Sequence, residues 1–443
     1  MPNIKELIPQ DIFKISNLLK TQNFSAYLVG GSVRDMFLGY NINDFDITTN
    51  ALPEDLKELF PNAILFGEKF GTIMIKEGNF NVEITTLRKD SEYLDSRHPK
   101  EVTFINDINI DLKRRDFTMN AIAYDFNKDQ IIDIFDGIKD IKNKVIRSVG
   151  NPDDRFKEDA LRLIRAVRFS FKLNFDIEED TFISILKNAK LINNISKERI
   201  RDEFLKIIKN ENSSVGVDML RKAGLLEYII PELIVCVGVK QNKYHSLDVY
   251  NHLLLSMDKA DERIKLAALL HDIGKPQTKQ GGHFFGHEKV GADISKEILE
   301  RLKFPKKEIE IITKLIYLHL FHYESTWSDA AVRRFLRKVG DMKILNLLFL
   351  LRVADEKGNP ISTYDFNNLE NFKKRIDTIN KKEGILSLKD LAINGEDLLG
   401  IGFIRDKKLG ETLNSLLDVI IESPELNKKE YLLKIAKNKL ENK

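Results

Sequence analysis

The apolar positions of the chain follow two different patterns, and the change between them falls near residue 145. Before this point, short runs rich in β-branched and aromatic residues are bounded by glycine, asparagine or charged residues, as is typical of strands. Residues 52–55 favour a helix start, because a proline comes early and acidic residues fill the first turn. The pattern predicts a mixed α/β domain over residues 1–145, with strands at 26–29, 46–48, 71–76, 81–86 and 118–124.

From residue 151 onward the pattern is helical almost throughout. Residues 160–171 and 200–208 repeat apolar side chains at i, i+3 and i+4, the spacing of one helix face. Glycine and proline near 222–231 indicate a further boundary. We therefore predict an α+β fold, in which a head with a mixed sheet (1–145) precedes helical regions at 146–235, 236–360 and 361–443.

Composition narrows the class of protein without naming a function. The 443 residues include 70 Lys and Arg and 68 Asp and Glu, so an RNA-binding surface would have to come from local clustering of charge. The single cysteine, Cys236, excludes an internal disulfide and has apolar neighbours, so we expect a buried thiol. No apolar run approaches the length of a membrane span and the N-terminus lacks a signal-peptide pattern. We expect a soluble, cytoplasmic protein with no membrane partner.

The clearest candidate chemistry is an Asp-x-Asp pair, Asp44 and Asp46. Side chains alternate along a strand, so the two carboxylates face the same side. They repel each other unless a cation bridges them, and hard divalent cations prefer oxygen ligands. Upstream, Gly30 and Gly31 form a place where the backbone could approach phosphates. Taken singly, the glycine pair could be a turn and the aspartates a solvated loop.

The combination is more specific than either part. Gly-Gly-Ser-Val-Arg-Asp at 30–35, followed by Asp44 and Asp46, resembles the signature of the polymerase-β-like nucleotidyltransferase superfamily. Within it, the run is similar to class II, the branch of tRNA nucleotidyltransferases and bacterial poly(A) polymerases. The resemblance implies a palm-like head that releases pyrophosphate, Mg²⁺ held by the two aspartates, and a triphosphate held by Gly30, Gly31 and Arg34.

Two further segments of the head match class II motifs. Glu83, in an E-x-T-x-x-R match, would be the third carboxylate, although a glutamate on an outward-facing strand position is the alternative. The polar segment 92–99 is similar to a flexible loop that the family needs for adding the terminal A, which argues against an enzyme that adds only CC.

The run Arg-Arg-Asp-Phe-Thr at 114–118 matches another class II motif. By the resemblance, Arg115 would bind the triphosphate and Asp116 would accept a hydrogen bond from the ribose 2′-hydroxyl. By spacing alone, the same run would be a charged turn before a strand.

The run 155–169 contains Glu158, Asp159 and three arginines, Arg162, Arg165 and Arg168. At i and i+3, Asp159 and Arg162 are expected to share one helix face, which the other two arginines extend. The alternative is a solvated helix with an ion pair worth a few tenths of a kcal/mol, roughly. Three arginines in one stripe, however, would repel one another without an anion.

An Asp–Arg pair can select bases by hydrogen-bond polarity. Cytosine and adenine present an amino donor beside a ring-nitrogen acceptor, which suits a carboxylate beside a guanidinium. Guanine and uracil present the reverse polarity, and a buried mismatch costs roughly 1–3 kcal/mol for each unpaired group. Class II enzymes give this role to the motif EDxxR, matched here by Asp159 and Arg162, and Arg165 and Arg168 fall on positions that contact the nucleotide. We therefore expect base recognition and RNA binding in residues 146–235.

The second half carries an adjacent His-Asp pair with outlying histidines. His252, His271, Asp272 and Asp355 match the core ligands of the HD phosphohydrolase superfamily, and His287 and His319 would complete a second metal site. The resemblance implies an HD domain at 236–360 and a divalent transition metal. Scattered histidines are normally structural, and such ligands can survive in a domain without hydrolase activity.

The tail at 361–443 resembles the C-terminal segment of class II enzymes, most clearly at 391–398. Where the family often has a Gly-Pro-rich turn, residues 404–408 add positive charge suited to an RNA backbone, or form a solvated loop.

The resemblance predicts addition of CCA to the 3′ end of tRNA from CTP and ATP, with contacts to the acceptor stem and T arm. The alternatives are an A-adding enzyme that works with a separate CC-adding enzyme, a poly(A) polymerase, and an HD phosphohydrolase with a vestigial head. The sequence leaves the oligomeric state open.

Overall fold

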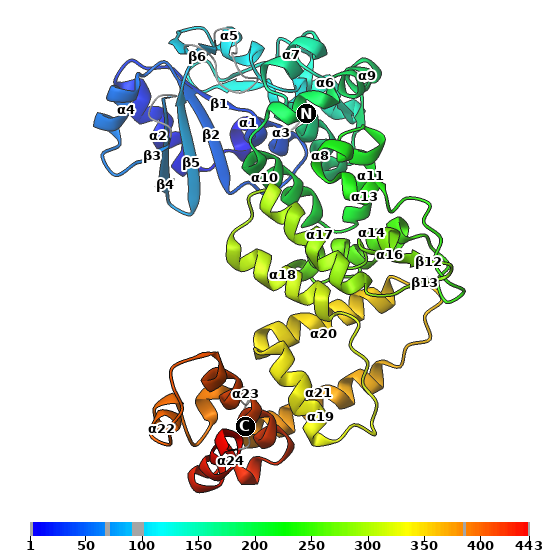
Figure 1. Ribbon diagram of the computed structural model, residues 1–443. Coiled ribbons are helices and arrows are strands. Elements are labelled where there is room, and N and C mark those ends of the chain that lie inside the picture. Colours follow the sequence, from blue (N-terminus) through cyan, green and yellow to red (C-terminus); the bar gives the residue numbers. More distant parts are fainter. Residues whose placement is uncertain (1–2, 67–70, 91–101, 384–386, 442–443) are drawn as a thin grey trace. The chain divides into compact units, whose positions relative to one another are not determined.

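The computed structural model describes residues 3–66, 71–90, 102–383 and 387–441 (Figure 1). The chain divides into two compact units. Unit 1 comprises Met1–Ile234 with Arg301–Lys303, and unit 2 comprises Val235–Glu300 with Phe304–Lys443.

Unit 1 begins with a seven-stranded mixed sheet of order β3-β4-β5-β2-β1-β8-β9, in which β2 and β5 are parallel and the other pairs antiparallel. The strands are β1 (Ala26–Val29), β2 (Asp44–Thr49), β3 (Ile64–Phe66), β4 (Thr72–Glu77), β5 (Phe80–Thr86), β8 (Ala123–Asp125) and β9 (Gln130–Ile132). Short pairs join β6 (Arg88–Asp90) to β7 (Val102–Phe104) and β10 (Val145–Ile146) to β11 (Asp176–Ile177). The mixed sheet of the predicted head is confirmed.

One predicted strand, 118–124, is wrong in its first half. Thr118–Asn120 forms a short 3₁₀ turn, η2, and the strand begins only at Ala123. The hydroxyl of Thr118 donates to Asp140 at 2.7 Å, and the amide of Asn120 donates to Asp116 at 2.9 Å. These side chains form hydrogen bonds with other side chains rather than with a neighbouring strand. Such bonds favour a turn over a strand.

The sheet buries one face and leaves its polar positions on the other. Phe45 and Ile47 on β2, and Val82 and Ile84 on β5, are buried. The positions between them therefore point to the opposite face, because side chains alternate along a strand. The surrounding helices and 3₁₀ turn are α1 (Ile4–Leu7), α2 (Gln10–Thr21), α3 (Gly31–Phe37), α4 (Pro53–Leu59), α5 (Ile108–Lys113), η2 (Thr118–Asn120) and α6 (Gly137–Asn143).

The rest of unit 1 is mainly helical and is centred on α8 (Leu161–Leu173), whose side chains are mostly buried. At Gly216 an added Cβ would lie 2.5 Å from Ile207 and 3.0 Å from Phe171, so only glycine permits this close helix packing. The remaining elements are α7 (Pro152–Glu158), α9 (Glu179–Asn188), η3 (Ala189–Asn194), α10 (Lys197–Ile208), α11 (Ser213–Lys222), α12 (Leu226–Ile229) and α13 (Pro231–Ile234).

In its described residues, unit 2 is helical apart from a two-stranded hairpin. Its first part contains α14 (Val249–Asp258), η4 (Glu262–Ile264), α15 (Lys265–Leu270), α16 (Lys275–Thr278), β12 (Lys279–Gln280), β13 (His283–Phe284) and α17 (His287–Arg301). Then follow α18 (Lys306–Leu318), α19 (Asp329–Val339), α20 (Met342–Lys357), α21 (Phe366–Glu383), η5 (Leu388–Asp390), α22 (Gly395–Leu399), α23 (Lys407–Glu422), η6 (Pro424–Leu426) and α24 (Lys429–Glu441).

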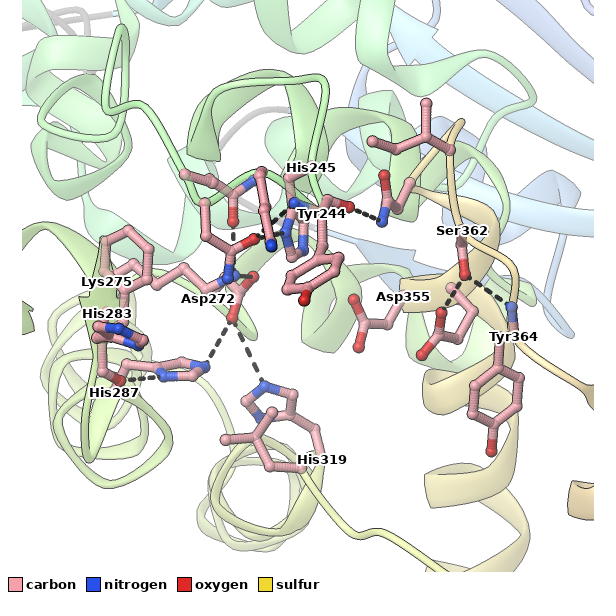
Figure 2. A pocket seen from close by; sticks show the side chains of 18 of the residues that line it. Tyr244, His245, Asp272, Lys275, His283, His287, His319, Asp355, Ser362 and Tyr364 are labelled. Atoms are coloured by element: carbon pink, nitrogen blue, oxygen red, sulfur yellow. Dashed lines mark hydrogen bonds and ion pairs between the residues drawn. The ribbon is translucent and has the colours of Figure 1, made fainter.

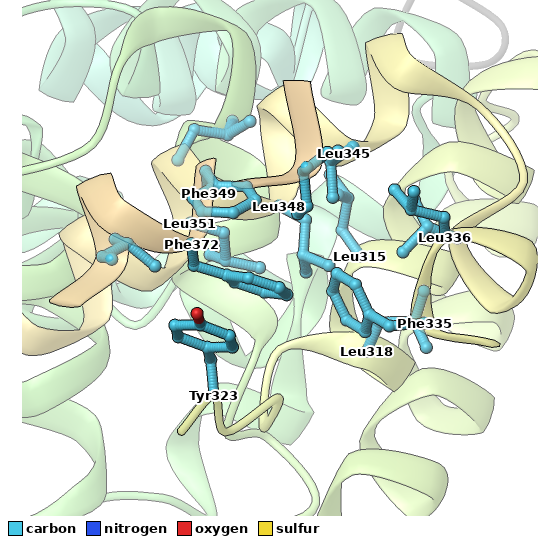
Figure 3. Close-up of a cluster of buried hydrophobic side chains, with 14 of the residues drawn as sticks. Leu315, Leu318, Tyr323, Phe335, Leu336, Leu345, Leu348, Phe349, Leu351 and Phe372 are labelled. Carbon is cyan, nitrogen blue, oxygen red and sulfur yellow. The ribbon is translucent and has the colours of Figure 1, made fainter. Parts of the chain in front are cut away.

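An aromatic core holds the middle of unit 2 together (Figure 3). Phe372 is fully buried and stacks on Tyr323, with ring centroids 4.0 Å apart. Phe335 and Phe349 pack against the same ring, at 5.3 and 5.8 Å. Cys236 is also buried, as predicted, and burial raises the pKa of its thiol to about 12. Across the described parts of the chain, no helix is both long enough and apolar enough to cross a bilayer.

Candidate active site

Three carboxylates meet on the open face of the head sheet. In the parallel pair of β2 and β5, Asp46 lies in register with Glu83, and Asp44 lies in register with Asn81. The Asn81 amide donates to Asp44 at 2.9 Å, and the backbone N–H of Asp46 donates to Ser32 Oγ at 2.9 Å. The structure therefore brings together the three acids singled out from the sequence.

This cluster is electrostatically strained. Burial, and then the charge of Glu83, raise the pKa of Asp46 to about 6, and Asp44 adds to the effect. Burial also raises the pKa of Glu83. Oxygen donors held together against their own repulsion suit a hard divalent cation.

Gly30 allows the backbone to pass close to this cluster. It has φ +68° and precedes α3, and an added Cβ would lie 2.7 Å from Arg115 Nη1 and 3.6 Å from Asp46 Oδ2. A larger residue would therefore displace Arg115 from the aspartates as well as straining the backbone. Gly31 follows at the start of α3, where an added Cβ would be 3.5 Å from Arg34 Nη2.

The two arginines predicted to bind triphosphate are held in different ways. Arg34 is buried, bonds to Asp35 at 2.7 Å and donates to Asn120 Oδ1 at 2.7 Å. Arg115 pairs with Asp111 at 3.2 Å, and its Nε is buried without a hydrogen-bond partner among the described residues. A buried N–H without a partner is costly, and an anion beside it would relieve that cost.

The carboxylate of Asp116 already accepts four hydrogen bonds from protein groups. Its Oδ1 accepts from the Phe117 N–H and from Asn120, and its Oδ2 accepts two N–H groups of Arg165, at 2.9 and 2.6 Å. Burial opposes ionisation, but Arg165 and Asn120 hold the pKa of Asp116 at about 2. A carboxylate has about four acceptor positions, so a ribose hydroxyl would have to displace one of these donors.

The expectation that Asp159 and Arg162 share one face of a continuous helix is wrong. The chain leaves the helix at Asp159, which is extended (φ −141°, ψ 101°) between the end of α7 at Glu158 and the start of α8 at Leu161. The Asp159 carboxylate accepts the Leu161 N–H at 3.1 Å, and this local bond competes with continued helix.

The anions that the arginine stripe is expected to need are carboxylates of the protein itself. Each arginine has a carboxylate of the protein: Arg162 pairs with Glu158 at 2.9 Å, Arg165 with Asp116 at 2.6 Å, and Arg168 with Glu203 at 2.6 Å. The guanidinium groups of Arg34, Arg165 and Arg168 all lie over the Phe169 ring, 4.1–5.2 Å from its centroid.

Sequence reasoning missed Glu203 and Arg199, because their partners Arg168 and Asp159 lie 35 and 40 positions away and no local spacing reveals such contacts. The segment 92–99, predicted to be a loop, lies outside the described residues.

A second candidate site lies in unit 2, in a cavity of about 610 Å³ (Figure 2). Four of the six residues predicted as HD ligands line this cavity: Asp272, His287, His319 and Asp355. His252 and His271 are buried directly beside them. The six residues come from α14, the residues after α15, α17, the residue after α18, and α20. One donor atom each of His252, His271 and Asp355 lie within 4.8 Å of one another, as do those of His271, Asp272 and His319. His287 Nε2 lies 3.1 Å from Asp272.

The histidines are oriented as metal ligands are. The Nδ1 atoms of His252, His271, His287 and His319 each face a backbone carbonyl, at 2.6–3.2 Å. A carbonyl accepts the Nδ1 proton and leaves the Nε2 lone pair directed into the cluster. The Nε2 atoms of His252 and His271 are 3.2 Å apart, so the cluster needs a proton or a metal between them.

The charges of this cluster are strongly coupled. Burial disfavours protonation of His271, yet Asp272 and Asp355 raise its pKa to about 10. Burial lowers the pKa of the His319 imidazole. Lys275 Nζ lies 2.5 Å from Asp272, and Arg352 Nη1 lies 3.4 Å from Asp355, so two cationic side chains stand beside the carboxylates of the cavity.

Three family models match successive parts of the chain. Residues 26–147 match the Poly A polymerase head domain, residues 174–236 the "Probable RNA and SrmB- binding site of polymerase A", and residues 242–357 the HD domain. The CCA-adding enzyme of Ligilactobacillus salivarius (strain UCC118) is 35% identical over 450 residues, covering 99% of this chain and 100% of that protein. The chain belongs to the family of CCA-adding enzymes. The CCA-adding enzyme of Enterococcus faecalis (strain ATCC 700802 / V583) is 33% identical over 95% of this chain and 93% of its own length.

Solved structures agree with this assignment. The crystal structure of the Bacillus stearothermophilus CCA-adding enzyme in complex with CTP has a TM-score of 0.68 and 28% identity, covering 98% of this chain and 99% of that one. A CCA-adding enzyme solved with ATP has a TM-score of 0.60 at 21% identity, which supports the fold alone. The predicted family, its HD domain, the α+β fold class and the nucleotidyltransferase class are confirmed. Enzymes of this family use a divalent metal.

Proposed function

We propose that the head of this CCA-adding enzyme extends the 3′ end of tRNA with C and A nucleotides from CTP and ATP, without a template, and releases pyrophosphate. The observation that carries the proposal is the register of Asp46 with Glu83, with Asp44 on the same open face and Gly30 beside them. Adjacent carboxylates beside a phosphate cradle are what nucleotidyl transfer requires.

Asp44, Asp46 and Glu83 fit Mg²⁺, because all three offer oxygen, and because burial and then the charges of Glu83 and Asp44 raise the pKa of Asp46. When bound, the ion supplies Lewis-acid stabilisation of the phosphate and a more acidic 3′-hydroxyl. Asp44 and Asp46 hold it on one strand, and Glu83 completes the oxygen set from the next strand.

The triphosphate lies against Gly30, Gly31, Arg34 and Arg115. Support comes from the buried Arg115 Nε, for which a phosphate oxygen is the missing acceptor. The ribose contact predicted for Asp116 requires Arg165 to give up one of its two hydrogen bonds, and we keep it as a prediction on that condition.

Asp159 and Arg162 select the base by hydrogen-bond polarity. Although they do not share a helix face, they lie at the same junction between α7 and α8, and each is fixed by protein partners. Arg165 and Arg168 contact the nucleotide from the same helix.

The tRNA acceptor stem and T arm contact the helical regions, where residues 404–408 contribute positive charge. We also propose four parts for the chain: head 1–145, neck 146–235, HD domain 236–360 and tail 361–443. The cytoplasmic location stays a prediction.

Three tRNAs test the nucleotide choice: one ending before CCA, one ending after C and one ending after CC. Each is incubated with CTP or ATP alone. We expect CMP incorporation on the first two and AMP incorporation on the third. Incorporation of AMP only, and only on the tRNA ending in CC, would instead select the A-adding enzyme. Long A tracts would select a poly(A) polymerase.

A second candidate function concerns the HD cavity. The inward-facing Nε2 atoms and the nearby carboxylates favour a divalent transition metal held by His252, His271, Asp272 and Asp355, with His287 and His319 available for a second ion. Metal-dependent phosphohydrolase activity would follow from such a site. A head mutant that lacks nucleotide addition but still hydrolyses phosphate esters would identify the HD cavity as the source.

A further inference from the structure

Arg199 on α10 holds the carboxylate of Asp159 by both oxygens. Its Nη1 donates to Oδ1 at 3.3 Å and its Nη2 donates to Oδ2 at 2.8 Å. The side chains are only 27% and 21% exposed, so the pair is partly shielded from water. Arg199 belongs to none of the motifs that identified the nucleotide site, and it lies 40 positions beyond Asp159.

The remaining hydrogen-bonding capacity of Asp159 can be counted. An ionised carboxylate has about four acceptor positions, two on each oxygen. Oδ1 accepts from Arg199 and from the Leu161 N–H, which fills it. Oδ2 accepts from Arg199 alone among the described residues. One acceptor position therefore remains, on Oδ2, and cytosine and adenine each have one exocyclic amino group to fill it.

The other arginines nearby do not substitute for this contact. Arg162 pairs with Glu158, Arg165 with Asp116 and Arg168 with Glu203. The carboxylate torsion of an aspartate is broad, so Asp159 without Arg199 can rotate and present either oxygen at variable positions. A rotating carboxylate can also turn away from the base edge and admit water, which would satisfy the polar groups of a mismatched base.

We propose that Arg199 is a positioning residue for base selection. By holding both oxygens of Asp159, it leaves one acceptor at a fixed position and so increases the discrimination of CTP and ATP from UTP and GTP. This inference rests on the proposed base-reading role of Asp159.

The bidentate contact, with one hydrogen bond to each carboxylate oxygen, can be made by arginine but not by lysine. A lysine keeps the positive charge but is a point donor, whereas the planar guanidinium fits both carboxylate oxygens at once. Arg199→Lys therefore separates orientation from charge. Arg201 lies on the same helix, pairs with Asp202 and donates to the Lys303 carbonyl, so Arg201→Ala is a charge-matched control.

The test measures kcat/KM for CTP and for UTP on a tRNA that lacks CCA. We expect the ratio of the two values to fall about tenfold in Arg199→Ala, which corresponds to one misplaced hydrogen bond. Arg199→Lys lowers the ratio less, and Arg201→Ala leaves it unchanged. If both Arg199 variants keep the wild-type ratio, the proposal is wrong, even when their overall kcat/KM falls. Arg199→Lys retains the charge of the pair, so it keeps the test decisive if Arg199→Ala does not fold.

Asp159→Ala separates this inference from the base-reading role on which it rests. If Asp159→Ala keeps the wild-type ratio, the base-reading role itself fails. If Asp159→Ala lowers the ratio and the Arg199 variants do not, only the positioning role fails. When Arg199 acts through Asp159, the double variant has the same ratio as Asp159→Ala, because the two changes are not additive. A further fall in the double variant would overturn the positioning role.

Discussion

Asp46 on β2 lies directly opposite Glu83 on the parallel strand β5. Parallel pairing of these strands places two carboxylates from segments 37 residues apart at one point, and Asp44 joins them from the same strand. Burial, and then repulsion by Glu83, raise the pKa of Asp46 to about 6, so these residues are poorly arranged for structural stability alone. The proposed function explains the arrangement, because a bound divalent cation would offset the repulsion between the carboxylates.

Glu83→Gln tests the third carboxylate. The amide keeps the size of the side chain but removes a negative charge and a ligand oxygen. We expect kcat for CMP addition to fall by about 10² or more, the size of effect seen when a positioned acid or base is lost. The rate of CMP addition is measured under single-turnover conditions on tRNA. Glu54→Gln, an exposed residue on α4, is the control. Equal rates in the Glu83 and Glu54 variants would exclude Glu83 from the reaction.

Asp116→Asn should change stability in a pH-dependent way. The pKa of Asp116 is lowered from 3.8 to about 2 in the folded protein. A lowered carboxyl pKa stabilises the fold above the unfolded value, and this stabilisation is lost as pH falls from about 4 through 2. The free energy of unfolding of the wild type should exceed that of Asp116→Asn by about 2 kcal/mol at pH 7. This difference should shrink toward pH 2.

Urea denaturation followed by circular dichroism at the two pH values measures this difference. Asp180→Asn, at an exposed position on α9, should change the free energy of unfolding little at either pH. A gap between wild type and Asp116→Asn that is equally large at pH 2 would show that the Arg165–Asp116 pair is not its source.

Much of this arrangement follows from the sequence, because local patterns and short motifs encode it. The strand alternation placed Asp44 and Asp46 on one face, and the apolar spacing located α8 and α10. The sequence did not predict the break at Asp159, because the apolar spacing continues across it. The break is visible only in the extended backbone of Asp159 and in its bond to the Leu161 N–H. Contacts such as Arg168 with Glu203 join distant segments, and no local pattern specifies them.

Phe372→Ala should weaken unit 2 strongly. Removing a fully buried phenylalanine leaves a cavity under Tyr323 and Phe335, at a cost of about 3–5 kcal/mol. Trp327, the single tryptophan of the chain, has its ring 5.7 Å from Phe372, so its fluorescence reports on this core during urea unfolding. Phe366→Ala, on the same helix but 37% exposed, should cost much less. Similar losses in both variants would contradict the packing described.

His271→Ala should abolish metal binding in the HD cavity while leaving nucleotide addition intact. His271 contributes to both candidate ligand sets, so its loss removes a donor from each. Elemental analysis after dialysis against Mn²⁺ or Ni²⁺ measures bound metal. His322→Ala removes an exposed histidine and should keep the wild-type metal content. Equal metal content in the two variants would place the metal elsewhere.

The central claim is that the carboxylates of the head sheet carry out nucleotidyl transfer to tRNA. Asp44→Ala, assayed for CMP and AMP addition and for tRNA binding by filter retention, tests it most directly, with Asp180→Ala as a charge-matched control. The account predicts that addition is abolished while tRNA binding stays at the wild-type level and the control remains active. Continued nucleotide addition by Asp44→Ala would contradict the mechanism.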